Sequence, residues 1–216
     1  MIRIVIIEDL PLILEGIKVL INQIVDFKVV AHYANGKEYI ENMHQAETDI
    51  VLTDINMPQM DGITTTKIAF GKDPELKIIA LSMHNDAKYY YEMITAGAKG
   101  FVLKQASVEE LETAIRDVYN GGSFFSSELL QGVIMEMQGI EKVLVDEKKH
   151  LLKISDRECD LLQLICKGYT NKQLAEALLV SVKTIESNKA QLMKKTSTIN
   201  NAGLIIWAIK NKVVII

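Results

Sequence analysis

Five short apolar runs alternate with longer helical patterns over about 120 residues, and this alternation limits the fold more than any other feature of the chain. The runs are rich in Ile and Val and apolar at consecutive positions, as in strands that are covered on both faces. The predicted strands are Ile2–Ile7, Lys28–Ala31, Ile50–Thr53, Ile78–Leu81 and Gly100–Leu103. Repeated β–α units of this length are typical of an α/β domain with a doubly wound, five-stranded parallel sheet.

The segments between these runs carry apolar residues at helical spacing. The predicted helices are Leu12–Ile24, Gly36–Met43, Gly62–Phe70, Ala87–Ala96 and Val108–Asn120. Three of them are followed by glycine, at Gly71, Gly97 and Gly121–Gly122, where a left-handed residue commonly caps a helix. Sheets of this class bind their ligands at the carboxyl ends of the strands.

The pattern changes after the first domain and is helical throughout from Ile154. The four predicted helices there are Asp156–Lys167, Asn171–Leu178, Val182–Lys195 and Ala202–Asn211. Thr170 and Gln173 fit a capping box, and Ser181 fits an N-cap. The predicted organisation is an α/β domain at residues 1–122, a linker at 123–150 with one helix at Glu128–Met137, and an all-α domain at 151–216.

Charge is divided unevenly between the two parts of the chain. Residues 151–216 contain 10 Lys and Arg against 5 Asp and Glu, whereas residues 1–150 contain 14 against 23. A basic domain joined to an acidic one suggests that the basic domain has a polyanionic partner. The alternative is that two small domains differ in charge by chance.

Composition excludes several classes of protein. With 49% hydrophobic and 24% charged residues, the chain is neither disordered nor fibrous. Cys159 and Cys166 are too few for a disulfide scaffold or a cysteine-rich zinc site, and we expect them to be buried apolar residues in a reducing compartment. The run Ile2–Ile7 is too short for a signal peptide or a membrane span, so the expected location is the cytoplasm, without membrane contact.

Acidic residues follow two of the predicted strands. Glu8 and Asp9 come after the first strand and Asp54 after the third, while Ser82 and Lys104 follow the fourth and fifth. Because the ends of parallel strands lie side by side, the three carboxylates would converge, and a site with only oxygen ligands favours Mg²⁺. Singly, such residues are ordinary loop carboxylates, caps or surface lysines. Together, they suit phosphoryl transfer to Asp54.

These residues resemble the receiver domain of two-component response regulators over roughly residues 1–120. The motifs that carry the resemblance are E-D after the first strand, D-I-N-M-P-Q-M-D-G around Asp54, L-S after the fourth strand and G-F-V-L-K ending at Lys104. The resemblance implies a flavodoxin-like receiver in which Asp54 accepts a phosphoryl group from a cognate sensor histidine kinase.

The same resemblance implies a role for each residue of the site. The implied Mg²⁺ ligands are Glu8, Asp9, Asp54 and the backbone carbonyl of Asn56. Ser82 would reorient towards the new phosphoryl oxygens, and Lys104 would pair with one of them. Phe101 occupies the position of the switch aromatic, where Tyr is common, and it cannot make the hydroxyl hydrogen bond.

The basic part resembles a LuxR-type helix-turn-helix over roughly residues 152–212. The motifs are S-D-R-E, G-Y-T-N-K-Q-L-A and S-V-K-T-I-E. A receiver followed by this module is the architecture of NarL/FixJ-type response regulators. Val182–Lys195 is then the recognition helix for the major groove, and Glu158 braces the helices.

The residues expected at DNA lie mainly on the recognition helix. They are Lys172, Lys183, Thr184, Glu186, Ser187, Lys189, Ala190 and Lys194. Ile185 and Leu192 are expected to face inward, with the lysines on other faces or at the C-terminal end. The lysines would supply affinity that does not depend on base sequence, while few side chains discriminate between bases.

Weak binding by a monomer predicts a homodimer on double-stranded DNA. By resemblance, Ala202–Asn211 is the dimer surface, although Trp207 within it is expected in the core. The chain end at Val213–Ile216 is expected to pack on a neighbouring element. RNA polymerase is a further candidate partner.

The function implied is a DNA-binding transcriptional regulator controlled by phosphorylation of Asp54. One alternative makes the receiver a constitutive dimerisation module, but intact Asp9, Asp54, Ser82 and Lys104 argue against it. Another is a hydrolase with an aspartyl nucleophile, but Asn56 stands where such phosphatases carry a second Asp. No enzymatic activity beyond slow self-dephosphorylation is therefore expected.

Overall fold

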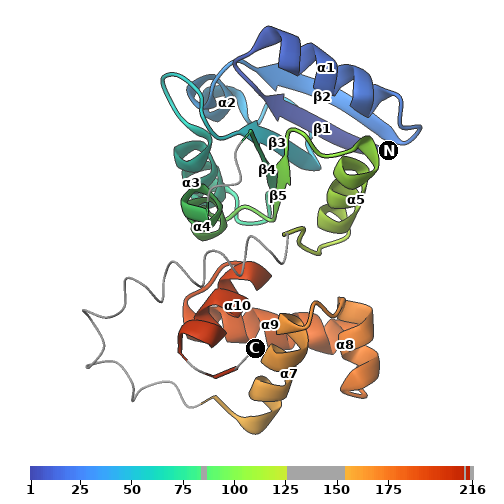
Figure 1. The fold of residues 1–216 in the computed structure, drawn as a ribbon, viewed down its shortest axis with the longest axis vertical. Helices are drawn as coiled ribbons and strands as arrows, with labels where there is room; N and C mark the ends of the chain where they lie inside the picture. Colours follow the sequence, from blue (N-terminus) through green and yellow to red (C-terminus); the bar gives the residue numbers. More distant parts are fainter. Residues whose placement is uncertain (84–86, 126–153, 212, 215–216) are drawn as a thin grey trace. The chain divides into compact units, whose positions relative to one another are not determined.

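The computed structural model describes residues 1–83, 87–125, 154–211 and 213–214 (Figure 1). The chain divides into two compact units, Met1–Ser126 and Ser127–Ile216. Within the described ranges, every helix is too short or too polar to cross a membrane. The helix expected at Glu128–Met137, in the linker, lies outside the described residues.

The N-terminal unit is built on a five-stranded sheet in the order β2-β1-β3-β4-β5, with all neighbours parallel. The strands are β1 Ile2–Ile7, β2 Phe27–Tyr33, β3 Ile50–Asp54, β4 Ile78–Ser82 and β5 Gly100–Leu103. The predicted bounds of β1 and β5 are confirmed, and the other three strands are slightly longer than predicted. The doubly wound parallel sheet is therefore confirmed.

In the part of the chain that the structure describes, five helices cover this sheet, three on one face and two on the other (Figure 1). They are α1 Pro11–Asn22, α2 Gly36–Asn42, α3 Gly62–Lys72, α4 Ala87–Ala96 and α5 Val108–Tyr119. Successive strand residues point to opposite faces, so Ile4 and Ile6 pack with α1 and α5 whereas Val5 and Ile7 pack with α2 and α3. This two-sided burial is the reason that the strands read as continuous apolar runs.

The glycine caps are confirmed at two of the three predicted places. Gly97 and Gly121 have φ of 116° and 83°, in the left-handed region that favours glycine. Gly71 was predicted wrongly as a cap, because α3 continues to Lys72 and the Asp73 N–H donates to the Ala69 carbonyl. A glycine in an exposed last turn has only a modest helix penalty, so the helix runs through it.

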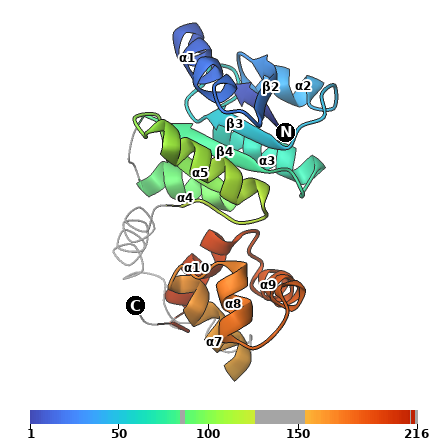
Figure 2. The ribbon, with the colours of Figure 1, turned by 90° about the vertical axis from the view of Figure 1, so that its right-hand side faces the viewer.

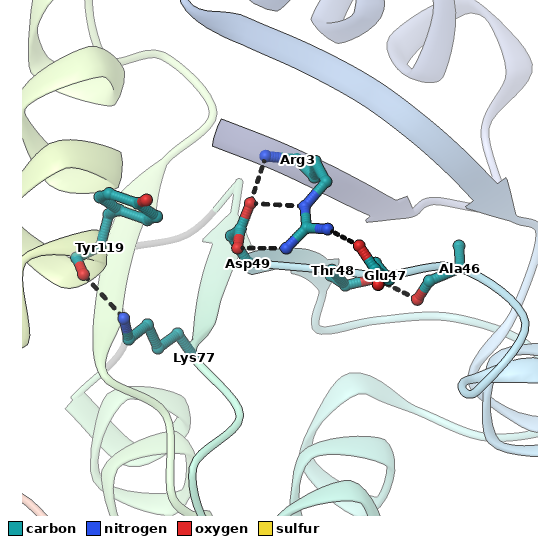
Figure 3. A network of polar contacts seen from close by, with 7 residues as sticks. All are labelled: Arg3, Ala46, Glu47, Thr48, Asp49, Lys77 and Tyr119. Atoms are coloured by element: carbon teal, nitrogen blue, oxygen red, sulfur yellow. Dashed lines mark hydrogen bonds and ion pairs between the residues drawn. The ribbon is translucent and has the colours of Figure 1, made fainter. Parts of the chain in front are cut away.

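Polar contacts link neighbouring elements at the amino ends of the strands (Figure 3). The Arg3 guanidinium donates to both carboxylate oxygens of Asp49, each at 2.9 Å, and also pairs with Glu47. Lys77, just before β4, donates to the Tyr119 carbonyl at 2.7 Å. These contacts join β1, β3, β4 and α5 at the amino ends of the strands. The candidate site lies at the opposite, carboxyl ends.

The C-terminal unit is all-α in its described part (Figure 2). Its helices are α7 Asp156–Cys166, α8 Asn171–Ala177, α9 Val182–Thr196 and α10 Asn201–Lys210. The capping box of Thr170 and Gln173 and the N-cap at Ser181 are confirmed, and Ser155 with Glu158 makes a second capping box.

One apolar core joins the four helices that the structure describes in this unit. Trp207 is half-buried and packs against that core, as predicted, and Val214 is buried in it. Cys159 and Cys166 are free and half-buried, and burial raises the pKa of the Cys166 thiol to about 11. Cys166 therefore stays a protonated thiol at neutral pH.

Candidate functional site

The carboxyl ends of β1, β3, β4 and β5 bring the predicted acidic and basic residues together. Glu8 follows β1, Asp54 closes β3, and Ser82 closes β4. Asp54 pairs in register with Leu81, and the Lys104 amide donates to the Ser82 carbonyl at 2.7 Å. The parallel register alone therefore places these residues at one edge of the sheet.

Lys104 joins two of the carboxylates. Its Nζ lies 2.7 Å from Oε2 of Glu8 and 3.0 Å from Oδ1 of Asp54. All three side chains are almost fully buried, with exposed fractions of 6%, 0% and 8% for Lys104, Glu8 and Asp54. The ammonium thus offsets part of the repulsion between two carboxylates that are removed from water.

The acidic cluster has more negative charge than Lys104 neutralises. Oxygen atoms of Glu8, Asp9 and Asp54 lie within 4.8 Å of one another. Burial raises the pKa of Glu8, and its hydrogen bond with Lys104 opposes this shift. Oδ1 of Asp9 is buried, and none of the described residues donates a hydrogen bond to it. A buried carboxylate oxygen without a partner is costly, so these residues fit a hard divalent cation.

Gly62, the first residue of α3, lies so close to the Asp54 backbone that no side chain would fit there. A Cβ on Gly62 would lie 2.0 Å from the Asp54 carbonyl oxygen, and the Gly62 N–H donates to the Ile55 carbonyl at 2.8 Å. Asp61 caps α3 by accepting from the Thr64 N–H. These two roles were not predicted, although the D-G pair after a strand carried the signal. Asn56, whose backbone carbonyl is a predicted Mg²⁺ ligand, is an exposed residue.

Phe101 turns inward and lies against aromatic neighbours. It is 3% exposed, and its ring meets that of Tyr90 edge-on at 4.9 Å between centroids. Tyr90 in turn meets Phe125 at 5.7 Å. Tyr90, on α4, is therefore packed between the predicted switch aromatic and a residue that follows α5.

The backbone of the same region adds a second connection. Residues 123–125, called the post-α5 segment here, run beside β5 at the sheet edge. The Phe101 N–H donates to the Phe124 carbonyl at 2.9 Å, and the Phe124 N–H donates to the Lys99 carbonyl at 3.0 Å. The post-α5 segment is thus tied to Phe101 by both backbone and rings.

In the C-terminal unit, most residues predicted at DNA are exposed. The exposed members are Lys172, Lys183, Thr184, Glu186, Ser187, Ala190 and Lys194. The Thr184 hydroxyl also lies 2.8 Å from that of Ser181, at the start of α9. Glu158 pairs with Lys195 at 2.8 Å, which confirms its predicted bracing role between α7 and α9.

Lys189 differs from the prediction that it faces outward. It is 7% exposed, and its Nζ donates to Oδ1 of Asn171 at 2.7 Å. The buried residues of α9 are Ile185, Lys189, Leu192 and Thr196. Their spacing of four, three and four residues defines one helix face, so position 189 falls on the stripe that packs inward.

Two family models match the chain. One is the response regulator receiver domain, at residues 4–116, and the other is the luxR family of bacterial regulatory proteins, at residues 152–208. The oxygen regulatory protein NreC of Staphylococcus aureus is 36% identical over 213 residues, covering 97% of this chain and 98% of that protein. The transcriptional regulatory protein DegU of Brevibacillus brevis is 30% identical over 223 residues, covering 97% and 94%.

A solved structure is similar as well. RcsB of Salmonella enterica serovar Typhimurium, bound to promoter P1flhDC in the presence of the phosphomimetic BeF3−, has a TM-score of 0.57 and 27% identity. The match covers 95% of this chain and 97% of that one.

Proposed function

The chain belongs to the response regulators that join a receiver domain to a LuxR-type DNA-binding domain, and from this premise we propose that Asp54 is its phosphorylation site. Such a protein is a phosphorylation-controlled transcriptional regulator. A receiver that serves only as a constitutive dimerisation module is not favoured. The observation that carries the assignment to Asp54 is its place at the end of β3, beside the Lys104 ammonium and the carboxylates of Glu8 and Asp9.

Asp54 acts as a nucleophile in this proposal. One of its carboxylate oxygens bonds to phosphorus, and the bond from phosphorus to the imidazole nitrogen of a sensor histidine kinase breaks, which leaves the kinase histidine free. Lys104 Nζ lies 3.0 Å from an Asp54 oxygen, which supports a role for its ammonium in pairing with the added phosphoryl group. Glu8 holds Lys104 from the other side.

Glu8, Asp9 and Asp54, with the backbone carbonyl of Asn56, would hold Mg²⁺. The bound ion supplies charge neutralisation at the phosphoryl oxygens. The buried Asp9 oxygen that lacks a partner among the described residues supports this assignment.

Ser82 and Phe101 form the response to phosphorylation. Ser82, buried at the end of β4, would donate its hydroxyl to a phosphoryl oxygen, and Phe101 would follow the movement of the β4 end. Slow self-dephosphorylation then reverses the modification: a water oxygen bonds to phosphorus, the bond from phosphorus to the Asp54 oxygen breaks, and inorganic phosphate leaves. We expect no chemical reaction of the chain itself beyond its own phosphorylation and this hydrolysis.

The C-terminal unit binds double-stranded DNA in this proposal. Lysines at positions 172, 183 and 194 would contact phosphates, while Glu186, Ser187 and Ala190 on the exposed side of α9 would face bases. The similar RcsB structure is a complex with promoter DNA, which supports DNA as the ligand. Homodimerisation on DNA and contact with RNA polymerase complete the proposal, and chromosomal DNA would place the protein in the cytoplasm.

Mass spectrometry of the intact protein tests the assignment to Asp54. With Mg²⁺ and acetyl phosphate, the wild type should gain one phosphoryl group, and Asp54→Asn should gain none. Asp117→Asn is the matched control, because Asp117 is an exposed aspartate on α5. An adduct on Asp54→Asn, or no adduct on the wild type, would contradict the proposal.

A further inference from the structure

Lys189 lies on the inward face of the proposed recognition helix, where a basic residue is not expected. Ile185 and Leu192, the neighbouring members of the stripe, are fully buried apolar side chains of the core. An ammonium group at such a position loses hydration and needs a hydrogen-bond acceptor. Lys189 has one in Oδ1 of Asn171, at 2.7 Å.

Asn171 makes this contact informative, because it is the first residue of α8. A short turn between Ala177 and Val182 joins the two helices, and Leu174 and Ala175 of α8 lie in the same buried apolar cluster as Ile185 of α9. The bond from Lys189 to Asn171 adds a polar contact at the far end of α8 from that turn. A contact far from the turn restricts how α9 can rotate or tilt on α8.

We propose that Lys189 is a positioning residue that sets the orientation of α9 on α8 through Asn171 and thereby places the exposed side chains of α9 against DNA bases. The proposal rests on the DNA-binding function proposed above. It assigns Lys189 a role different from that of Lys183, which is exposed near the start of the same helix and is available to a phosphate. Lys189 acts on base recognition without itself touching DNA.

The two roles differ in their dependence on salt and on DNA sequence. A lysine that neutralises a phosphate contributes to binding of any duplex, and its loss reduces the steepness of the negative slope of log K against log salt concentration by about one. A positioning residue changes discrimination between sequences and leaves that slope unchanged. The probes are two labelled duplexes of equal length, one selected by the wild type from a randomised library and one of mixed sequence.

Lys189→Met retains a long unbranched side chain that suits a buried position but cannot donate to Asn171. Affinity for the selected duplex should fall about tenfold, in line with the loss of one hydrogen bond from a charged group. Affinity for the mixed-sequence duplex and the salt slope should stay unchanged. Lys183→Met, the matched control, should weaken binding to both duplexes and make the negative salt slope shallower by about one.

Two further variants separate positioning from general stability. Lys189→Arg can still donate to Asn171 and should restore discrimination. Asn171→Ala should reduce discrimination in the wild type but add nothing in the Lys189→Met background, because both changes remove the same contact. Trp207 is the single tryptophan of the chain and packs against the core of the C-terminal unit. Its fluorescence during unfolding therefore reports whether that unit is folded in each variant.

Three outcomes would overturn the inference. A negative salt slope that becomes shallower by about one in Lys189→Met would assign Lys189 to a phosphate. A lower unfolding temperature with unchanged discrimination would make it a core residue only, and no change in any of these readouts would give it no role. A wild type that selects no duplex and binds neither probe would instead contradict the DNA-binding function itself.

Discussion

The Lys104 ammonium and the Asp54 carboxylate form a buried ion pair, with Nζ 3.0 Å from Oδ1. Lys104 also contacts Glu8, so one cation serves two carboxylates while Asp9 has a buried oxygen without a donor among the described residues. The site therefore holds excess negative charge before any phosphoryl group arrives.

Replacing Lys104 by Ala should destabilise the receiver. The change leaves Glu8 and Asp54 buried without their shared cation, and breaking a buried ion pair typically costs about 3 kcal/mol. Calorimetry of the full chain should show a lower unfolding temperature for the receiver and an unchanged transition for the C-terminal unit. An unchanged receiver transition would mean that the pair is not formed in solution.

Mg²⁺ should raise the unfolding temperature of the wild-type receiver, because the ion binds only the folded carboxylate cluster. Asp9→Asn should weaken this effect, since it removes one of the three carboxylates. Burial raises the pKa of Glu8, and protons compete with the metal, so Mg²⁺ affinity should fall as the pH is lowered from neutral. Titration calorimetry over a series of pH values measures this, and an affinity that stays constant throughout would contradict the assignment of Glu8 as a ligand.

Gly62→Ala should lower both receiver stability and phosphorylation. Its Cβ would lie 2.0 Å from the Asp54 carbonyl oxygen, so the backbone at Asp54, the proposed phosphorylation site, must shift at a cost of roughly 1–3 kcal/mol. Gly16→Ala is the matched control, because nothing lies within 4 Å of its Cβ position on α1. That substitution should stabilise the receiver by about 0.5–1 kcal/mol, and equal effects of the two would refute the steric argument.

Lys189 should make the stability of the C-terminal unit depend on pH. Burial lowers the pKa of Lys189 to about 8, and Glu186 partly opposes this shift. Between about pH 8 and 10.5 the unfolded lysine keeps its proton while the folded one releases it, so the free energy of unfolding rises with pH.

Comparing the wild type with Lys189→Met separates the pH dependence due to Lys189 from that of other titrating groups. The raised pKa of Cys166 acts in the opposite sense, because its unfolded thiol ionises first. The stability of the wild type relative to Lys189→Met should therefore increase by about 2 kcal/mol from pH 7.5 to pH 9.5. Denaturant titration followed by Trp207 fluorescence measures it, and a constant difference would show that Lys189 is not buried in solution.

Phe125→Ala should uncouple phosphorylation from DNA binding. Tyr90 packs between Phe101 and Phe125, and the Phe124 backbone bonds that of Phe101, so a shift of Phe101 should reach the post-α5 segment. The ratio of DNA affinities with and without beryllofluoride should fall by about threefold, while phosphorylation stays normal. Tyr119→Ala, a partly exposed aromatic on α5, should leave the ratio unchanged. If the ratio of DNA affinities in Phe125→Ala equals that of the wild type, the contact from Phe101 through Tyr90 to Phe125 does not couple phosphorylation to DNA binding.

The elements of the fold were predictable because their signals are local. Apolar runs marked the strands, and Thr170 with Gln173 and Ser181 marked the starts of α8 and α9. The convergence of Glu8, Asp54 and Lys104 was predictable too, because parallel strands bring their ends to one edge. The prediction that Gly71 caps a helix was wrong, because a glycine that follows an apolar pattern has the same local signal whether or not the helix ends there.

The sequence by itself thus determined the elements, their order and the chemistry at the ends of the strands. Only the tertiary structure decided that Lys189 faces inward to Asn171, that one oxygen of Asp9 lacks a donor among the described residues, and that Phe125 reaches Tyr90. The reason is physical. Local propensity and periodicity depend on neighbours in the chain, whereas burial and pairing depend on groups brought close by packing of segments far apart, and a lysine has the same local signal whether its ammonium meets water or an asparagine.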